Sequence, residues 1–273
     1  MSWRAAWRGV ILVLSLIFCY LRFGCVWVWS ALKGRPVSSQ QRAEWMHFCG
    51  RIVLAAIGID YRVEGEAPSG ATLIVANHLS YLDIAICSAA APSLFVAKHE
   101  IADWPGFGTL ARIGGTIFVD RVSRISAWEV ADRMASRLAE RVPVLLFPEG
   151  TSTDGSEVVR FHPTLFAAAV EGGLPVTPVA IFYEPHGAKK EERDLCWYGD
   201  ELFFPHLLRV LAVDGFSAVV RFGKPEVYPD RKTAAWRSHD AVARLRETAR
   251  EAAPESLREP AQVHQRTGSL IRA

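Results

Sequence analysis

The apolar residues of this chain are concentrated in its first sixty positions. Residues 10–20 are almost wholly apolar, and after Arg22 the run continues over residues 23–32 with two tryptophans. Residues 40–57 repeat apolar side chains at helical spacing and carry a polar side. The pattern predicts two consecutive helices within residues 1–59, the first very apolar and the second amphipathic.

Three interpretations fit the first helix, and two fit the second. A secretory signal peptide is disfavoured, because the apolar stretch is too long and no small-residue cleavage site follows it cleanly. A transmembrane helix of about 20 residues would hold Arg22 near its centre, at a cost of roughly 2–3 kcal/mol. A helix within one leaflet would let Arg22 reach the headgroups. The second helix either docks on the membrane with the first or covers the core of the following domain.

Short apolar runs alternate with helical stretches from Tyr61 onward. The expected strands span residues 72–76, 94–97, 116–119, 142–147, 176–182 and 217–222, and the expected helices span residues 82–90, 125–141, 164–171, 201–211 and 239–252. Buried apolar strands are typical of parallel sheets that are covered on both faces. We therefore expect an α/β domain over residues 60–253, with a mixed, mostly parallel sheet flanked by helices, and a loose polar tail over residues 254–273.

Composition narrows the functional classes. Half of the 273 residues are apolar, 22% are charged and the mean hydropathy is +0.13, which excludes a disordered chain. A net charge of only +2 argues against a dedicated nucleic-acid binder. The five cysteines include no CxxC pair, so neither a disulfide framework nor a zinc site is expected. We expect them to be buried and reduced.

The first cluster of polar residues, 77–83, directly follows the first buried strand. In open α/β sheets, binding sites lie at the carboxyl ends of the strands. His78 and Asp83 would stand about 140° apart on one continuous helix, so they meet only if His78 lies in the turn and Asp83 in the first helical turn. Ser80 is then the expected N-cap of that helix.

Two roles remain open for this cluster. Asp83 stands three residues after Ser80, where the acid of a capping box stands, and His78 would then be an ordinary turn histidine. Alternatively, Asp83 bonds one imidazole nitrogen, and the other nitrogen takes a proton from a substrate hydroxyl. The chain contains no G-x-S-x-G elbow, and Ser80 has a capping role available, so we do not expect a serine nucleophile.

Two further clusters lie beside later strands. The second cluster is a polar turn made of Glu149, Gly150, Thr151 and Ser152. Its carboxylate, glycine and hydroxyls suit a polyol or an anion, although an ordinary loop has the same composition. The third cluster begins at Gly115 and ends at Arg121, whose guanidinium suits either a phosphate or a surface salt bridge.

Four blocks, in this order, resemble those of the glycerolipid acyltransferase superfamily. They are NHLSYLD from Asn77, GTIFVDR from Gly115, FPEGTS from Phe147 and VTPVAI from Val176. The first three match the family patterns N-H-x-x-x-x-D, G-x-x-F-x-x-R and P-E-G-T, and Pro178 is central in the fourth. The matched region, residues 72–182, covers about two fifths of the chain and most resembles bacterial 1-acyl-sn-glycerol-3-phosphate acyltransferases.

This resemblance implies a role for each candidate residue. His78 is the general base for the acceptor hydroxyl, and Asp83 orients it. The deprotonated oxygen attacks an acyl thioester carried by coenzyme A or acyl carrier protein, with no acyl-enzyme, metal or other cofactor. The acceptor is held by Asn77, Arg121, Glu149, Gly150, Thr151 and Ser152, with Lys98 and Gly115 as further members. Family members dock on the membrane through N-terminal helices. If the first helix spans the bilayer, Lys33, Arg35 and Arg42 on its C-terminal side favour the cytoplasmic side of the inner membrane for the main domain.

The acceptor itself has two readings. The resemblance puts lysophosphatidate first, which would give phosphatidic acid. Many family members have an arginine after E-G-T, where this chain has Ser152, and the loss of a guanidinium weakens the case for a phosphate-bearing acceptor. A related group acylates lyso-ornithine lipid, which lacks phosphate, and this is the alternative.

Other functions have less support. A membrane lipid hydrolase needs a serine or cysteine nucleophile near His78, and none stands in a recognised context. A silent lipid-binding protein of the same fold would have lost His78 or Asp83. Residues 106–111 formally match a dinucleotide-binding pattern, but they do not follow a strand, so we expect a loop and the start of a short helix. Trp104 and Phe107 either line an acyl channel or pack in the core.

Overall fold

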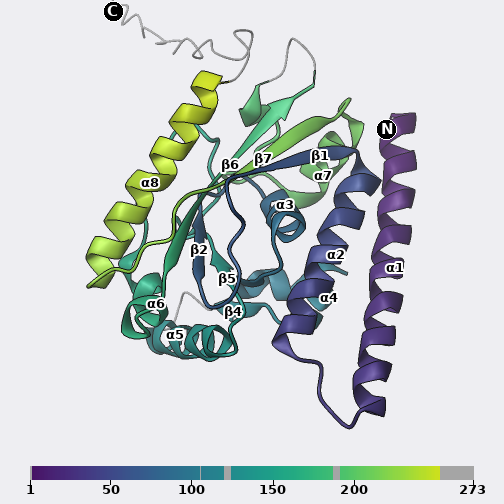
Figure 1. Ribbon diagram of the computed structural model, residues 1–273. Coiled ribbons are helices and arrows are strands. Elements are labelled where there is room, and N and C mark those ends of the chain that lie inside the picture. Colours follow the sequence, from purple (N-terminus) through teal and green to yellow (C-terminus); the bar gives the residue numbers. More distant parts are fainter. Residues whose placement is uncertain (1, 105, 120–123, 187–190, 253–273) are drawn as a thin grey trace, which may run out of the picture.

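A mixed β-sheet lies at the centre of the molecule (Figure 1). The computed structural model describes residues 2–104, 106–119, 124–186 and 191–252, and within them the sheet has seven strands. The strands are β1 (Ile59–Glu64), β2 (Leu73–Ala76), β3 (Leu94–Lys98), β4 (Ile117–Val119), β5 (Val144–Leu146), β6 (Val176–Pro185) and β7 (Phe216–Phe222). They lie in the order β1-β7-β6-β2-β5-β3-β4, and neighbours run parallel except for β6 and β7. The predicted mixed, mostly parallel sheet is confirmed.

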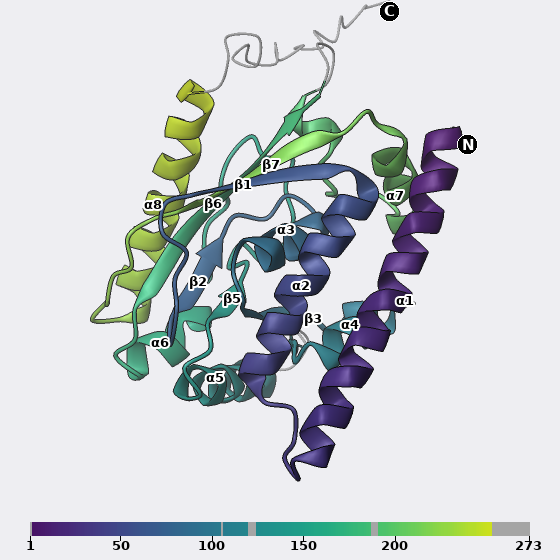
Figure 2. The same cartoon turned by 45° about the vertical axis from the view of Figure 1, so that its right-hand side comes forward.

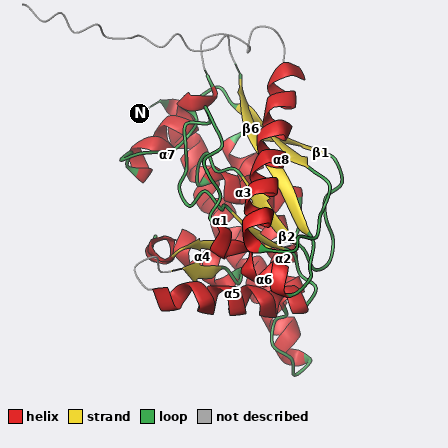
Figure 3. Ribbon diagram, turned by 90° about the vertical axis from the view of Figure 1, so that its left-hand side faces the viewer, coloured by secondary structure: helices red, strands yellow, loops and turns green. Residues whose placement is uncertain are grey.

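Helices cover both faces of this sheet. The α-helices are α1 (Trp3–Leu32), α2 (Ser39–Ile57), α3 (Leu82–Ala90), α4 (Phe107–Ile113), α5 (Arg124–Ala139), α6 (Ala167–Glu171), α7 (Phe203–Ala212) and α8 (Arg231–Ala252), and short 3₁₀ helices lie at His99–Asp103, Pro163–Phe166 and Glu192–Asp194. One face packs against α5, α6 and α8, and the other packs against α2, α3 and α7 (Figures 1 and 3). α1 lies outside the second group, at the edge of the molecule (Figure 2).

One strand was missed by the prediction, and two predicted helices differ from the structure. β1 was not predicted, because this edge strand pairs on one side only and exposes much of its length, which leaves no apolar run in the sequence. The helix predicted over residues 164–171 is a 3₁₀ turn followed by the short α6. α8 begins at Arg231, about two turns before the predicted start at His239. The Asp230 carboxylate accepts hydrogen bonds from the first backbone N–H groups of this polar extension.

α1 and α2 form the predicted helical hairpin (Figure 1). α1 has 30 residues and is long and apolar enough to cross a membrane. α2 lies against α3, where a Cβ atom at Gly50 would stand 2.6 Å from the Ala85 carbonyl oxygen, so only a glycine permits this approach. Leu54 and Ile57 of α2 belong to the apolar core between the sheet and the helices on this face. The second helix therefore covers the α/β core, and the first packs on that core through Ala5 and Leu12 while most of its large apolar side chains stay exposed.

The cysteines follow the prediction at four of five positions. Cys19, Cys49, Cys87 and Cys196 are buried thiols, whereas Cys25 is exposed. Cys25 lies on α1, whose sequence is apolar all round, so periodicity alone could not assign it to the outward face. The polar tail predicted over residues 254–273 lies outside the described residues.

Candidate active site

The turns that follow β2 and β5 lie side by side. The two strands are parallel neighbours, with Leu73 opposite Val144, so their carboxyl ends reach the same edge of the sheet. His78 follows β2, and Glu149 follows β5. The backbone N–H of Thr153 donates to the His78 carbonyl oxygen over 2.9 Å, which ties the two turns together. Sheet order thus brings the first and third sequence blocks into one site.

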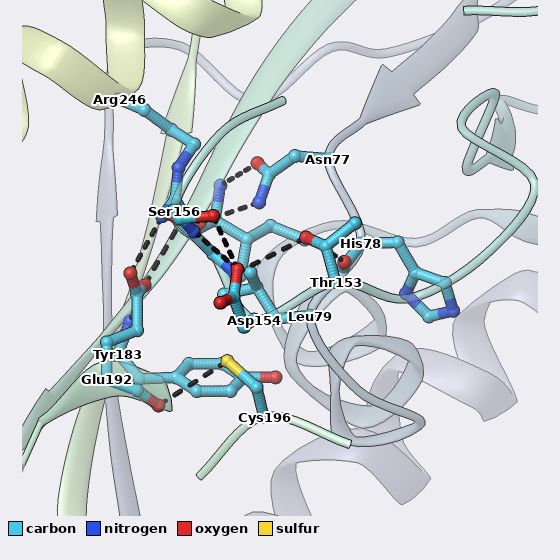
Figure 4. A network of polar contacts seen from close by, with 12 residues as sticks. Asn77, His78, Leu79, Thr153, Asp154, Ser156, Tyr183, Glu192, Cys196 and Arg246 are labelled. Atoms are coloured by element: carbon cyan, nitrogen blue, oxygen red, sulfur yellow. Dashed lines mark hydrogen bonds and ion pairs between the residues drawn. The ribbon is translucent and has the colours of Figure 1, made fainter. Parts of the chain in front are cut away.

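His78 and Asp83 meet as the catalytic interpretation requires. His78 Nδ1 lies 2.8 Å from Asp83 Oδ2, and the Asp83 side chain is fully buried whereas that of His78 is 18% exposed. A carboxylate accepts hydrogen bonds, so Nδ1 carries the proton and Nε2 is the basic nitrogen of the neutral ring. The ring stacks on Phe147 with centroids 4.1 Å apart. The ring points away from Asn77, Glu192 and Arg246 (Figure 4).

Asp83 makes the contact that the catalytic interpretation requires and also binds the backbone of the turn, but the predicted capping box with Ser80 as the N-cap is wrong. Besides binding His78, its Oδ2 accepts hydrogen bonds from the backbone N–H groups of Leu79 and Ser80, at 2.7 and 3.0 Å. The helix begins at Leu82, and Tyr81 rather than Ser80 occupies the N-cap position. The Ser80 hydroxyl is fully buried and accepts a hydrogen bond from Leu82 N–H over 3.3 Å. A buried hydroxyl held in this way does not suit a nucleophile.

Tyr183 binds the remaining oxygen of Asp83, and sequence reasoning missed it. Its hydroxyl donates to Asp83 Oδ1 over 2.5 Å, and its side chain is buried. Burial and the nearby Asp83 carboxylate hold the pKa of Tyr183 well above its ordinary value, so the hydroxyl stays a donor. Tyr183 lies one residue beyond the predicted end of β6, on the same strand face as Val179 and Ile181. This alternation was the signal that could have found it.

Glu149 binds the backbone of the His78 turn. Its Oε1 accepts a hydrogen bond from His78 N–H at 2.9 Å, and its Oε2 accepts one from Val159 N–H at 3.1 Å. Burial raises the pKa of the Glu149 carboxyl to about 7, although these two hydrogen bonds and the charge of Arg246 act in the opposite direction. Both carboxylate oxygens are thus engaged within the protein. Its predicted contact with the acceptor stays a prediction.

Asn77 and the remaining residues of the Glu149 turn differ in how deeply they are buried. The buried Asn77 side chain binds the backbone of Ile181 in both directions, donating over 3.0 Å and accepting over 2.8 Å. Gly150 has a φ of +76°, a conformation that favours glycine. Thr151 is exposed and Ser152 is half-buried. Asn77 therefore fixes the chain just before His78, and the hydroxyls of the turn lie nearer to solvent.

Lys98 and Gly115 lie at the β3–β4 end of the sheet. Lys98 is the last residue of β3, is exposed and stands opposite Val119 of β4. Gly115 has a φ of +80°, a conformation that favours glycine, and a Cβ atom there would stand 3.1 Å from the Arg42 side chain. Arg121, the predicted phosphate ligand, lies outside the described residues. The binding roles of these three residues stay predictions.

Arg246 of α8 is a second residue that sequence reasoning missed. It is 4% exposed and donates to the carbonyl oxygens of Ile181 and Gly155 and to the Glu192 carboxylate, the last over 2.7 Å (Figure 4). Asn77 also binds Ile181, so Arg246 is connected through Ile181 to the residue that precedes His78. The signal was a charged residue four positions after Val242, on the apolar side of an amphipathic helix.

An apolar cavity of about 130 Å³ lies beside the turn. Tyr81 and Leu82 line it, together with apolar side chains of α1, α2, α4 and α7. Trp104 and Phe107 also line it, and Trp104 packs on Phe203 with ring centroids 4.4 Å apart. These aromatic residues therefore pack on Phe203 at the wall of an apolar cavity, and a role in an acyl channel stays a prediction.

The chain matches known acyltransferases. A family model described as acyltransferase matches residues 59–182. The lyso-ornithine lipid O-acyltransferase of Pseudomonas aeruginosa is 39% identical over 171 residues, which are 63% of this chain and 65% of that protein. The protein of the same name from Rhodobacter capsulatus is 38% identical over 201 residues, 70% of this chain and 72% of the relative. The 1-acyl-sn-glycerol-3-phosphate acyltransferase of Neisseria meningitidis is 36% identical over 146 residues, 53% and 57% of the two chains.

A solved structure supports the fold. The 1-acyl-sn-glycerophosphate acyltransferase of Thermotoga maritima superposes with a TM-score of 0.62 at 21% identity, covering 90% of this chain and 99% of that one. At this identity the likeness shows the fold alone. The matched family region contains the four sequence blocks, and the match to the Rhodobacter relative spans more than two thirds of each chain. The chain therefore belongs to the acyltransferase family, as its four blocks predicted.

Proposed function

We propose that this protein transfers a fatty acyl group from an acyl thioester to the free hydroxyl of a lysolipid. The observation that carries the proposal is the 2.8 Å contact between His78 Nδ1 and the fully buried Asp83 carboxylate. This contact fixes the imidazole in the tautomer whose Nε2 accepts a proton. His78 is then the general base, and Asp83 is the residue that orients it.

The reaction needs no enzyme nucleophile. His78 Nε2 takes the proton of the acceptor hydroxyl as its oxygen attacks the thioester carbonyl. The ester C–O bond forms, the C–S bond breaks, and the imidazolium returns the proton to the leaving thiolate. The acyl carrier is coenzyme A or acyl carrier protein, and either provides the same thioester. The buried Ser80 hydroxyl supports this direct route over a lipid hydrolase with a serine nucleophile.

The proposed acceptor is lyso-ornithine lipid, and lysophosphatidate is the second candidate. The Pseudomonas and Rhodobacter relatives, both named for lyso-ornithine lipid, match this chain over more residues and at higher identity than the Neisseria relative. Ser152 also stands where many family members carry an arginine, which suits an acceptor without phosphate. Lysophosphatidate remains a candidate because relatives named 1-acyl-sn-glycerol-3-phosphate acyltransferase also match this chain.

The proposed location is the cytoplasmic side of the inner membrane. α1 is the described helix that is long and apolar enough to cross a bilayer, and Lys33, Arg35 and Arg42 follow its core. Basic residues beside an apolar helix tend to stay in the cytoplasm. Protease digestion of inside-out and right-side-out vesicles would test this, because the α/β domain should be cut only in the first.

One assay tests the activity and the acceptor together. Protein in phospholipid vesicles is given labelled acyl-CoA or acyl carrier protein thioester, with lyso-ornithine lipid, with lysophosphatidate, or with neither. We expect diacyl product from lyso-ornithine lipid, with one free thiol released per product. His78→Ala should abolish it, whereas His162→Ala, at an exposed histidine, should not. Unchanged turnover in His78→Ala would refute the base assignment, and free fatty acid without an acceptor would indicate a hydrolase.

A further inference from the structure

α7 carries an apolar outer face. Leu202, at its N-cap, and Phe204 and Leu208 within it are exposed by 71%, 61% and 46%. Phe204 and Leu208 are four residues apart and share one side of the helix. His206 and Val210 lie on the opposite side and are buried. Neighbouring exposed apolar side chains of this size mark an interaction surface rather than isolated surface residues.

This face continues the surface of α1. The two helices lie side by side (Figure 2), and a Cβ atom at Gly9 would stand 3.9 Å from Leu211. The Arg8 guanidinium donates to the Val213 carbonyl oxygen over 2.7 Å and joins the end of α7 to α1. The adjoining half of α1 also exposes large apolar side chains, namely Trp3, Trp7, Val10, Val13, Leu14 and Ile17. The two helices therefore present one apolar region to their surroundings.

We propose that the outer face of α7 is a second membrane-contacting surface, which inserts Leu202, Phe204 and Leu208 into the same leaflet as α1. The occupant is lipid because the face adjoins a 30-residue helix that is itself apolar enough to enter a bilayer. Charged residues stand at the margin of the region, where headgroups would lie. Arg209 pairs with Glu201 beside the face, and Arg4 pairs with Asp214 at its end.

The position of α7 gives this contact a consequence for the cavity. Phe203 and Leu207 of α7 line the cavity beside the His78 turn, and Leu12 and Leu16 of α1 line it as well. The helix pair therefore forms the wall between the proposed bilayer surface and the cavity. Anchoring both helices in one leaflet would place this wall at the depth of the lipid acyl chains.

The depth of α7 is measured with an environment-sensitive fluorophore on the full chain. Phe204→Cys is labelled in a background in which the exposed Cys25 is replaced by alanine. Trp236→Cys is the matched control, because Trp236 is an aromatic residue with 69% exposure on α8, at the side of the molecule opposite α1 (Figure 1). Both proteins are reconstituted into phosphatidylethanolamine–phosphatidylglycerol vesicles, with and without brominated acyl chains.

We expect the label at position 204 to shift to the blue and to be quenched several-fold more strongly by brominated lipid than the label at position 236. Emission at position 204 that matches the solvent-exposed control would overturn the proposal. A blue shift without quenching would overturn it as well, because a protein surface, such as a second copy of the chain, would then cover α7. The measurement does not involve turnover, so it is independent of the proposed acyl transfer.

Discussion

Two buried carboxylates lie on either side of His78, and they bind different parts of it. Asp83 contacts the imidazole ring, whereas Glu149 accepts a hydrogen bond from the backbone N–H of the same residue. Asp83 is 0% exposed and Glu149 is 3% exposed, so burial does not distinguish them. The difference lies in the atom that each one holds. Asp83 fixes the orientation of the imidazole that we propose as the base, and Glu149 fixes the path of the chain that carries it.

Asp83→Asn should have the largest effect, and it should act on turnover. The amide can present an N–H group to His78 Nδ1, which would favour the wrong tautomer, so we expect kcat to fall roughly 10²–10⁴-fold. The loss of charge-assisted hydrogen bonds from Leu79, Ser80 and Tyr183 should lower the free energy of unfolding by about 1–3 kcal/mol. Steady-state acyl transfer and urea unfolding in detergent measure the two quantities. A variant that loses stability but keeps its kcat would place Asp83 with Glu149 as a purely structural carboxylate.

Arg246→Met should have the next largest effect, and it should act on stability. The substitution removes the ion pair with the Glu192 carboxylate and the hydrogen bonds from Arg246 to the carbonyl oxygens of Ile181 and Gly155, whereas the hydrogen bond from Asn77 to Ile181 stays. Breaking a buried ion pair in this way costs about 3–5 kcal/mol of unfolding free energy. Arg244→Met is the matched control on the same helix, because its ion pair with Asp240 is exposed and should be worth less than about 1 kcal/mol.

The urea midpoints of these two α8 variants decide whether the Arg246 network supports the site. Arg246→Lys keeps the charge but loses the planar fork, so it should recover only part of the lost stability. Equal midpoints for Arg246→Met and Arg244→Met would show that the network contributes nothing beyond a surface pair. The chain around His78, which Glu149 also binds, would then gain no stability from α8.

Glu149→Gln should change how stability depends on pH. The pKa of this carboxyl rises from an ordinary 4.5 to about 7 in the folded protein, chiefly through burial. The folded chain therefore holds the proton more tightly than the unfolded chain. The stabilisation is complete below pH 4.5 and is lost as the pH rises through 7, a change of about 3 kcal/mol. The glutamine variant should lack this slope.

Urea unfolding between pH 4 and pH 8 compares the wild type with Glu149→Gln. We expect the difference between the two unfolding free energies to change across this window, while kcat for the folded variant stays close to that of the wild type. A pH-independent difference would contradict the raised pKa. A loss of kcat as large as that of Asp83→Asn would contradict the division of roles between the two carboxylates.

The parts of the site that the sequence predicted are local. His78 and Asp83 are five residues apart, so turn and helix geometry sufficed to predict their contact. The apolar runs likewise predicted the covered, mostly parallel sheet. The order of the strands does not follow from those runs, and it is this order that places the turn after β5 beside the turn after β2.

The parts that were missed depend on long-range contacts. Tyr183 is 100 residues from Asp83 in sequence, and Arg246 is 54 residues from Glu192. Strand alternation at Tyr183 and the apolar helix side at Arg246 could mark both residues as buried, but neither pattern names the partner of the buried polar group. Their roles appear only when the packing of β6 and α8 shows which buried oxygen each one satisfies.

Tyr183→Phe should have the smallest effect of these variants. It removes one hydrogen bond to Asp83 and leaves the contact between Asp83 and His78 in place. The phenyl ring keeps the packing but leaves Asp83 Oδ1 without its donor, at a cost of about 1–3 kcal/mol if the oxygen finds no other partner. If that donor holds the carboxylate plane in line with the imidazole, kcat should fall roughly tenfold while KM changes little, since about 1.4 kcal/mol of transition-state stabilisation would be lost.

A matched variant separates this positioning role from stability alone. Tyr228→Phe removes a buried hydroxyl from the opposite core of the sheet, away from Asp83. It should leave kcat and the pH–rate profile unchanged even where it lowers the urea midpoint. Tyr183→Phe should alter both kcat and the pH–rate profile, because the carboxylate that faces the base would be hydrogen-bonded differently. If the two variants lose stability alike and neither changes the profile, Tyr183 is a packing residue, and Asp83 orients His78 through its backbone hydrogen bonds alone.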